Sequence, residues 1–249
     1  MAAILVALSG PSGAGKSTVA AALARRDRWA KVDEAFDRLV PAPDLRFASQ
    51  RELRRLELRL LGEEARRFAE ARRWVRAGQT VVADTPFLDP VGYTAGLFVL
   101  GLASVSTFRA VVQRARGLAL DGQLGVPDLT VELSVASTTR LARAARDAAR
   151  HPAALRDRHE AVGAVDGAIL LPWWRHRFPG RVRMVGADRH VDLVAERIRA
   201  LASRTAPLRD PCGAGARALE ALVRLPALRE PLDRSGKVKK GTPSPRPPR

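Results

Sequence analysis

The chain has 249 residues, 46% of them hydrophobic, so it can bury one sizeable α/β core but has little room for a second full domain. Its formal net charge of +17 would suit a nucleic-acid or acidic-membrane partner, yet the sequence carries no zinc-finger, RNA-binding or helix-turn-helix signature. The single cysteine, Cys212, excludes an intramolecular disulfide and a cysteine-based metal cluster, and it fits a reducing cytoplasm.

The first third of the chain predicts two short strands and two helices. Residues 2–8 form a continuous apolar run closed by a serine and a glycine, which is typical of a buried central strand. An alanine-rich stretch over residues 16–26 predicts a helix, and residues 29–32 predict a second strand. Residues 47–77 place apolar side chains at helical spacing among charged ones, which indicates a long amphipathic helix.

The rest of the chain alternates in the same way between apolar runs and helical patterns. Strands are expected at residues 80–83, 129–135 and 182–185. Helices are expected at residues 138–150, 153–177 and 190–203, and a shorter one at 216–223. Because strand and helix alternate, we expect an α/β fold with a parallel sheet and helices on both of its faces.

An uncharged stretch between Asp89 and Arg109 is long enough to raise the question of a membrane span. Glycine, serine and threonine dilute it, and we expect one apolar helix buried within the α/β core instead. The apolar run at residues 2–8 has no basic segment before it and leads into a glycine-rich loop, so we also expect no cleaved signal peptide.

That glycine-rich loop follows the first predicted strand directly and precedes the first predicted helix. Residues 10–18 read GPSGAGKST and fit the phosphate-binding pattern G-x-x-x-x-G-K-[ST]. Glycines are needed because backbone N–H groups must turn inward around a β-phosphate, while the helix N-terminus adds a favourable dipole. The residues expected to bind the nucleotide are Gly10, Ser12, Gly13, Ala14, Gly15, Lys16, Ser17 and Thr18.

Lys16 stands where the pattern demands lysine, although only five of the 43 basic residues are lysines. We expect it to reach the β- and γ-phosphate oxygens and to act in catalysis, while the Ser17 hydroxyl ligates Mg²⁺. Asp84, at the end of the third predicted strand, is the expected acidic partner and would hold the metal through water. The alternative is that Asp84 only caps the turn that follows it.

The order of these segments resembles the thymidylate kinase and deoxynucleoside kinase branch of the P-loop kinases, over about residues 3–203. The resemblance is carried by the GPSGAGKST loop, the acidic segment 32–35, the long helix, the segment 84–87 and the strand at 127–135. It implies a P-loop NTPase fold whose five-stranded parallel sheet has the order 2-3-1-4-5, with an arginine-rich lid at about residues 138–158.

Two departures from that branch concern the phosphoryl acceptor. Thr85 stands where thymidylate kinases have an arginine that grips the acceptor's phosphate, and Ser134 stands where an aspartate is usual. The absence of that arginine argues against a nucleoside monophosphate as acceptor, so the acceptor could be a free nucleoside or another hydroxyl compound such as an antibiotic. The candidate acceptor-binding residues are Arg38, Phe87, Tyr93 and Arg146.

Acids at the end of the second strand are the candidate bases. Glu34 is the first choice to accept the hydroxyl proton, and Asp33 is nearly as good. The alternative is a solvated acidic loop in front of a helix. In the lid, Arg143, Arg146 and Arg150 share one helical face, and Arg143 is expected to clamp phosphates unless that face is simply exposed and basic.

These observations favour a cytoplasmic, ATP- and Mg²⁺-dependent kinase acting on a nucleoside, nucleotide or similar small hydroxyl compound. We expect a kinase-like domain at residues 1–205, a partly helical extension at 206–232 and a disordered, basic, proline-rich tail at 233–249. We expect neither a stable nucleic-acid partner nor a membrane partner, and the sequence leaves a homodimer open. The alternatives are a regulatory P-loop ATPase without a small-molecule acceptor and a nucleic-acid-processing P-loop protein.

Overall fold

The computed structural model describes residues 2–39, 47–146 and 153–228. Its centre is a five-stranded sheet in which every neighbouring pair of strands is parallel, in the order β2-β3-β1-β4-β5. The strands are β1 (Leu5–Ser9), β2 (Ala30–Val32), β3 (Val81–Ala83), β4 (Leu129–Ser134) and β5 (Val182–Gly186). The fold class and strand order predicted from the sequence are therefore confirmed.

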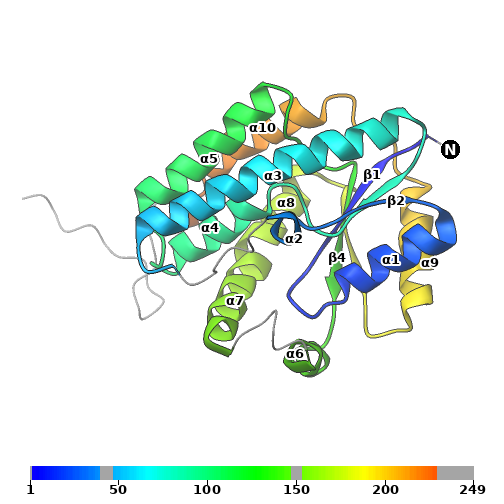
Figure 1. Ribbon diagram of the computed structural model, residues 1–249, viewed down its shortest axis with the longest axis horizontal. Helices are drawn as coiled ribbons and strands as arrows, with labels where there is room; N and C mark the ends of the chain where they lie inside the picture. Colours follow the sequence, from blue (N-terminus) through cyan, green and yellow to red (C-terminus); the bar gives the residue numbers. More distant parts are fainter. Residues whose placement is uncertain (1, 40–46, 147–152, 229–249) are drawn as a thin grey trace, which may run out of the picture.

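Helices cover both faces of this sheet (Figure 1). One face carries α1 (Lys16–Asp27) and α9 (Val191–Ala202), and the other carries α3 (Gln50–Arg76), α4 (Asp89–Val99), α5 (Val105–Leu120) and α10 (Pro211–Leu222). The central strand serves both layers, because Leu5 and Ala7 pack into one core whereas Val6 and Leu8 pack into the other. Continuous apolar character in β1 follows from this burial on both sides.

The long helix α3 begins and ends at clear sequence signals. The Ser49 hydroxyl accepts a hydrogen bond from the Glu52 N–H (3.2 Å), and the Glu52 carboxylate accepts one from the Ala48 N–H (2.8 Å). This exchange satisfies N–H groups that have no partner within the helix. The helix stops at Ala77, and Gly78 follows with a φ of 83°, a conformation that glycine adopts without steric cost.

The uncharged stretch differs from the single helix expected there. It forms α4 and the start of α5, joined by a turn at Gly101, whose φ is 72°. Ser104 caps α5 by accepting a hydrogen bond from the Thr107 N–H (3.1 Å). A continuous apolar run has the same hydrophobic pattern whether it forms one helix or two, so the pattern could not reveal the break between α4 and α5. Among the described helices, none is both long and apolar enough to cross a membrane.

The region expected to be one helix over residues 153–177 has three parts. These are α7 (Ala153–Val165), a π-helical segment (Asp166–Leu170) and α8 (Leu171–Arg177). A π-helical turn inside a helix is rare and occurs often at functional sites. The remaining described elements are α2 (Ala35–Arg38), α6 (Ser137–Arg146) and a 3₁₀ turn (Pro226–Leu228).

The C-terminal extension is tied to the sheet through Asp128, which is 1% exposed. Its carboxylate accepts one hydrogen bond from the Leu5 N–H (2.8 Å) at the start of β1 and another from the Leu208 N–H (2.6 Å) in the extension. The Arg181 guanidinium donates to the carbonyl oxygens of Asp128 and Ala206, both at 2.9 Å. Helix α10 then packs on α5, and the predicted tail at residues 233–249 lies outside the described residues.

Candidate active site

The glycine-rich loop between β1 and α1 is curled, and its glycines adopt backbone angles that other residues avoid. Gly10, Gly13 and Gly15 have φ values of 129°, 79° and 92°. A Cβ atom at Gly10 would lie 2.8 Å from the Leu133 carbonyl oxygen on the neighbouring strand β4. Backbone strain and close packing therefore both require glycine at this position.

Lys16 begins α1, and its side chain bends back over the loop. Its Nζ donates a hydrogen bond to the Gly10 carbonyl oxygen (2.8 Å) and lies 3.4 Å from the Pro11 oxygen. The first turn of α1 contains no acidic side chain, so the positive end of the helix dipole faces the loop without an internal counter-charge. Such a curled loop at a helix N-terminus is suited to bind an anionic polyphosphate.

A cavity of about 780 Å³ opens from this loop and extends over the carboxyl ends of the strands toward α3, α4 and α7. Its volume lies in the range of small-molecule sites, about 300–1,000 Å³. Ligands of open α/β sheets bind at this edge, where the strand order reverses. The predicted site residues that line it are Gly10, Ser12, Gly13, Gly15, Lys16, Ser17, Thr18, Glu34, Phe87, Tyr93 and Arg143.

The two candidate bases are placed differently. Glu34 lines the cavity at the start of α2. The Asp33 side chain is 57% exposed and accepts a hydrogen bond from the Lys31 Nζ (2.5 Å), so it lies outside the cavity lining. The geometry favours Glu34 over Asp33 as the acid near a substrate, and both roles remain predictions.

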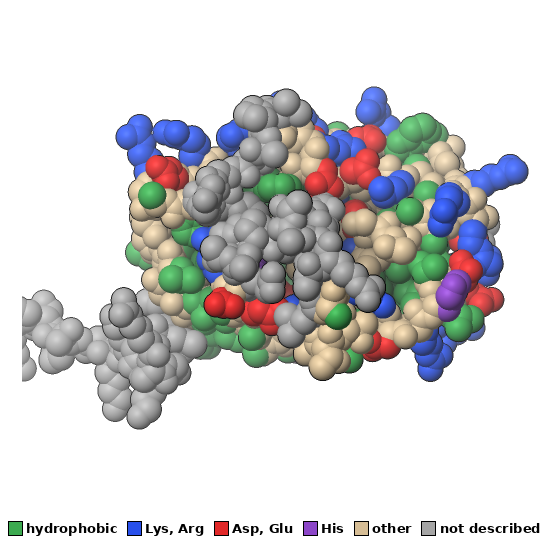
Figure 2. Space-filling model, turned by 60° about the horizontal axis from the view of Figure 1, so that its bottom comes forward, with side chains coloured by type: hydrophobic (Ala, Val, Ile, Leu, Met, Phe, Trp, Pro, Cys, Tyr) green, Lys and Arg blue, Asp and Glu red, His purple; other side chains and the backbone are tan. Residues whose placement is uncertain are grey.

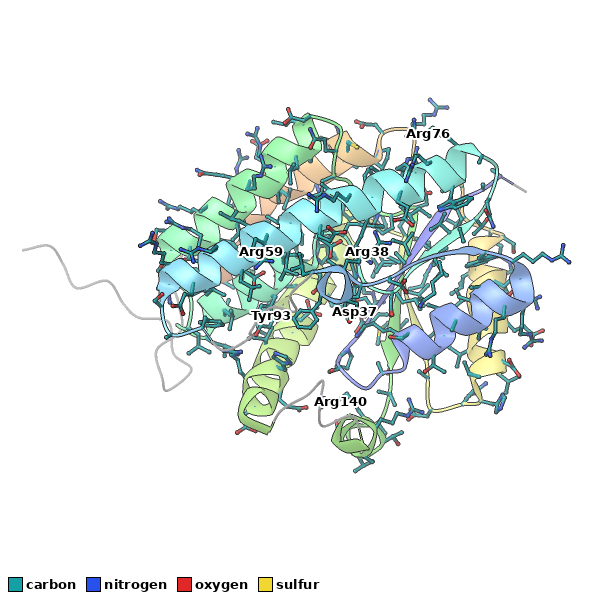
Figure 3. The ribbon with its side chains drawn as sticks, viewed as in Figure 1. Asp37, Arg38, Arg59, Arg76, Tyr93 and Arg140 are labelled. Atoms are coloured by element: carbon teal, nitrogen blue, oxygen red, sulfur yellow. The ribbon has the colours of Figure 1, made fainter. Side chains whose placement is uncertain are left out.

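Arg38 is engaged with the long helix instead of the cavity. Its guanidinium lies 2.8 Å from the Glu70 carboxylate and 3.7 Å from that of Glu63, both on α3. Figure 3 shows Arg38 and Asp37 at the short helix α2, which lies just below α3 in this view. Tyr93 lies lower, beside α7, where its ring meets the His159 ring edge-on at 5.8 Å.

The expected metal partner Asp84 lies directly after β3 and is 3% exposed. Its backbone N–H donates to the Val32 carbonyl oxygen (3.1 Å), and its Oδ1 has no hydrogen-bond partner among the described residues. Burying a carboxylate oxygen without a hydrogen-bond partner costs free energy. We therefore expect a ligand or an ordered water to interact with this oxygen. Ala14, which we also expected to bind the nucleotide, is a buried residue of the loop.

The lid region contributes Arg143, which lines the cavity beside Gly15 and lies 3.5 Å from the Ala187 carbonyl oxygen. Arg140 connects α6 to α7 through a two-pronged contact with the Glu160 carboxylate, with Nη2 and Oε2 2.7 Å apart (Figure 3). The side chain of Arg146 and the whole of Arg150 lie outside the described residues.

Sequence reasoning missed a set of carboxylic acids that line the cavity between the phosphate loop and the helices α3, α4 and α7. They come from α3, α4, β4 and the π-helical segment: Glu57, Glu64, Asp89, Glu132 and Asp166. A signal for the first two was present, because Glu57 and Glu64 share the face of α3 that buries Leu53 and Phe68. Charged residues at core-facing positions are rare unless they are paired or functional.

Burial perturbs the protonation of these acids. The pKa of Glu57 is raised well above its ordinary value, first by burial and then by the nearby Asp89 carboxylate. Burial raises the pKa of Asp166 to about 7, with Glu132 and Asp89 adding to the effect. Burial is also the main cause of the raised pKa values of Asp89 and Glu132, although the Asp89 side chain is open to the cavity.

Glu64 differs from the other acids because it forms a buried pair with Arg67, which is 0% exposed. Arg67 also donates to the carbonyl oxygens of Asp33 and Thr85, and its guanidinium lies 5.1 Å from the centre of the Phe87 ring. This arginine thus joins the ends of β2 and β3 to the long helix.

The sequence and the fold were compared with known proteins. A family model described as an AAA domain matches residues 5–107, which is less than half of the chain. No curated protein matches the sequence.

Solved structures extend the match to most of the chain. A deoxyadenosine kinase from M. mycoides, solved with bound dATP, is 14% identical with a TM-score of 0.60, covering 79% of this chain and 97% of its own. A thymidylate kinase from Candida albicans is 15% identical with a TM-score of 0.58, covering 81% of this chain and 91% of its own. At such low identity the likeness concerns the fold. The predicted resemblance to the thymidylate and deoxynucleoside kinase branch is thus confirmed at the level of the fold.

Proposed function

We propose that the chain is an ATP- and Mg²⁺-dependent phosphotransferase that acts on the hydroxyl group of a small molecule. The observation that carries this proposal is that Lys16, in the phosphate loop, and Glu34, at the end of β2, line one cavity that continues well beyond the loop. A protein that only hydrolysed ATP would need no such additional chamber beside its phosphates.

The proposed step transfers the γ-phosphoryl group in line from ATP to the acceptor. The acceptor oxygen forms a bond to the γ-phosphorus while the bond from that phosphorus to the β,γ-bridging oxygen breaks, and ADP leaves. Glu34 accepts the proton that the hydroxyl loses. Lys16 exchanges its hydrogen bond with the Gly10 oxygen for the β- and γ-phosphate oxygens, where it stabilises negative charge.

The residues present fit a magnesium ion near the loop. Ser17 offers a hydroxyl in the cavity lining, and Asp84 offers a buried carboxylate whose Oδ1 lacks a partner among the described residues. Once bound, the ion would neutralise charge on the β- and γ-phosphates. Arg143 lines the cavity beside Gly15, and we expect it to contact the same phosphates when α6 closes over them.

A screen for ADP release with different acceptors tests the proposal. A coupled assay with Mg–ATP would compare nucleosides, nucleoside monophosphates and hydroxylated antibiotics with an acceptor-free control. We expect at least one class to stimulate ADP release, and Glu34→Gln to lower the stimulated rate more than the Kd for Mg–ATP. Turnover that no acceptor stimulates would instead favour the regulatory ATPase.

The nucleic-acid alternative makes a separate prediction. It requires salt-dependent oligonucleotide binding that survives deletion of residues 233–249. On the face shown in Figure 2, Lys and Arg side chains are spread around the edge with acidic side chains among them, which is unlike a continuous basic track.

A further inference from the structure

The cavity has the opposite charge character to the chain as a whole. The chain carries a net charge of +17, yet six carboxylic acids lie among the described residues of the cavity lining: Glu34, Glu57, Glu64, Asp89, Glu132 and Asp166. The described lysine and arginine side chains of the lining are Lys16, Arg143 and Arg181. Lys16 and Arg143 lie at the phosphate loop, from which Lys16 also acts electrostatically on Asp89 and Glu132. Arg181 donates hydrogen bonds to two carbonyl oxygens.

Glu57 gives the strongest evidence that these acids bind a ligand. It is 1% exposed, lines the cavity from α3, and its Oε2 has no hydrogen-bond partner among the described residues. Arg158 acts on it electrostatically, but less strongly than burial and Asp89 act in the opposite direction. Glu132, which is 7% exposed, presents a second such oxygen, Oε2, from β4, although its carboxylate is also hydrogen-bonded to the Ser9 side chain and interacts with Lys16. Acceptor oxygens buried without donors are costly unless a ligand supplies the donors.

The acids also surround one another. Asp89 interacts electrostatically with Glu57, Glu64 and Asp166, and in the opposite sense with the cations Lys16 and Arg67. No set of three or more acidic, histidine or cysteine side chains among the described residues is arranged to hold a metal ion. An organic cation fits this arrangement better than a metal does. Aromatic rings of Tyr93 and Trp174 also line the cavity, and such rings attract ammonium groups.

We propose that the acidic part of the cavity recognises a hydroxyl compound that carries one or more ammonium groups, with Glu57 and Asp89 as its principal cation-binding carboxylates. The ligand's role as phosphoryl acceptor rests on the proposed function, whereas its binding does not. A phosphate monoester would bring further negative charge against these acids, and like charges at short range in a cavity repel strongly. Lys16, Arg67 and Arg158 act on these carboxylates, but the pKa values of Glu57, Asp89 and Glu132 stay raised because burial has the larger effect. A neutral polyol would satisfy the oxygens without adding the positive charge that the ionised carboxylates still lack.

Binding of a cation to these acids would be linked to proton release. Burial and the neighbouring Asp89 raise the pKa of Glu57, and burial raises the pKa of Asp166 to about 7. An ammonium group favours the ionised carboxylates, so protons leave when it binds. The heat of binding should therefore depend on the ionisation enthalpy of the buffer.

Calorimetry on the full chain with four probes tests the proposal. The probes are 2-deoxystreptamine, which is a cyclitol with two amino groups, myo-inositol, which is a cyclitol without them, thymidine and thymidine monophosphate. We expect the diamine to bind roughly tenfold or more tightly than each of the others. Its heat should differ between phosphate and Tris buffers at neutral pH, in the sense of proton release.

Variants identify the carboxylates. Glu57→Gln removes the charge at nearly constant shape and should weaken diamine binding roughly tenfold. Asp89→Asn, whose side chain is open to the cavity, gives the same test if Glu57→Gln does not fold. Glu196→Gln on α9, where the side chain is 64% exposed and away from the cavity, is the matched control and should bind like the parent protein.

Several results would overturn the proposal: no diamine binding, equal or tighter binding of inositol, thymidine or the monophosphate, or unchanged affinity in a folded Glu57→Gln protein. Mg–ATP binding is measured in a separate experiment, so that failure of the ammonium-binding proposal can be distinguished from failure of the proposed function. Loss of the kinase reaction with diamine binding intact refutes only the phosphotransfer, whereas acceptor-stimulated ADP release with thymidine alone refutes only the cationic acceptor.

Discussion

The two ends of the cavity are constructed differently. At the phosphate end a single run of chain, residues 10–18, supplies backbone N–H groups and one lysine, and its shape depends on glycines. At the acidic end the side chains come from α3, α4, β4 and the π-helical segment, and their positions depend on how those elements pack. The first is a local device that any strand–loop–helix unit can carry, whereas the second exists only in the complete fold.

If the acidic end depends on long-range packing, loss of its buried cation should affect stability most. Arg67→Met leaves Glu64 buried without its partner and frees the carbonyl oxygens of Asp33 and Thr85. We expect the free energy of unfolding, measured by urea denaturation, to fall by about 3–5 kcal/mol.

The neighbouring residue provides the control for that change. Arg66→Met removes an arginine whose side chain is 79% exposed, and its partner Glu63, although buried, keeps Arg38 at 3.7 Å, so the loss should stay below about 1 kcal/mol. Equal losses in the two variants would show that the acidic end does not depend on the buried pair.

At the phosphate end the largest effect should be on turnover and not on stability. Lys16→Ala removes the side chain assigned to the transferred phosphoryl group, and we expect the rate of ADP release to fall about 10²–10³-fold. The circular dichroism spectrum should change little, because the hydrogen bonds of this side chain are to the Gly10 and Pro11 carbonyl oxygens of its own loop. Arg25→Ala, an exposed position on the same helix, should keep full turnover, and an unchanged rate for Lys16→Ala would contradict the assigned phosphate role.

A glycine substitution tests whether the loop shape itself matters. Gly10→Ala places a Cβ 2.8 Å from the Leu133 oxygen at a φ of 129°, so we expect a loss of about 1–3 kcal/mol in stability together with weaker Mg–ATP binding. Gly117→Ala in α5, where a Cβ meets open space, should instead stabilise the protein by about 0.5–1 kcal/mol. The comparison fails if calorimetry finds Mg–ATP bound equally well by the Gly10 variant.

The smallest effect concerns pH and the acidic end. The folded-state pKa of Asp166 is raised to about 7 from 3.8, so its contribution to stability is complete below about pH 4 and is lost as pH rises through 7. The free energy of unfolding of the parent protein should decrease between pH 4 and 8. In Asp166→Asn this decrease should be smaller by about 1–2 kcal/mol. Thermal unfolding across this range measures it, with Asp121→Asn at the exposed end of α5 as control. Parallel curves for all three proteins would be inconsistent with a raised pKa.

The sequence revealed the phosphate end because its signal is local. Residues 10–18 contain the whole pattern, and the five apolar runs gave every strand of the sheet to within about three residues. Glu34 could be placed near the cavity for the same reason, since the carboxyl ends of parallel strands meet at one edge. The resemblance to P-loop kinases then supplied the strand order.

The acidic end was not predictable because no segment contains it. Glu57 and Glu132 are far apart in the sequence, and only the packing of α3 beside the sheet brings both to one cavity. The side chain of Asp166 is positioned by a π-helical turn that has no recognised hydrophobic pattern. Arg38 shows the opposite error: a residue near the expected site in sequence faces α3, because Glu63 and Glu70 offer it partners there.

The position of Asp128 has a consequence for the order in which the nascent chain can mature. The central strand β1 is synthesised first, yet it pairs with β4, and the Leu5 N–H is satisfied only by a carboxylate 123 residues later, which in turn holds Leu208. Contacts of such long sequence separation form slowly. The first strand can therefore be fully bonded only after the ribosome has released β4, which ends at Ser134, and the Asp128 carboxylate reaches its second partner only after Leu208 has followed.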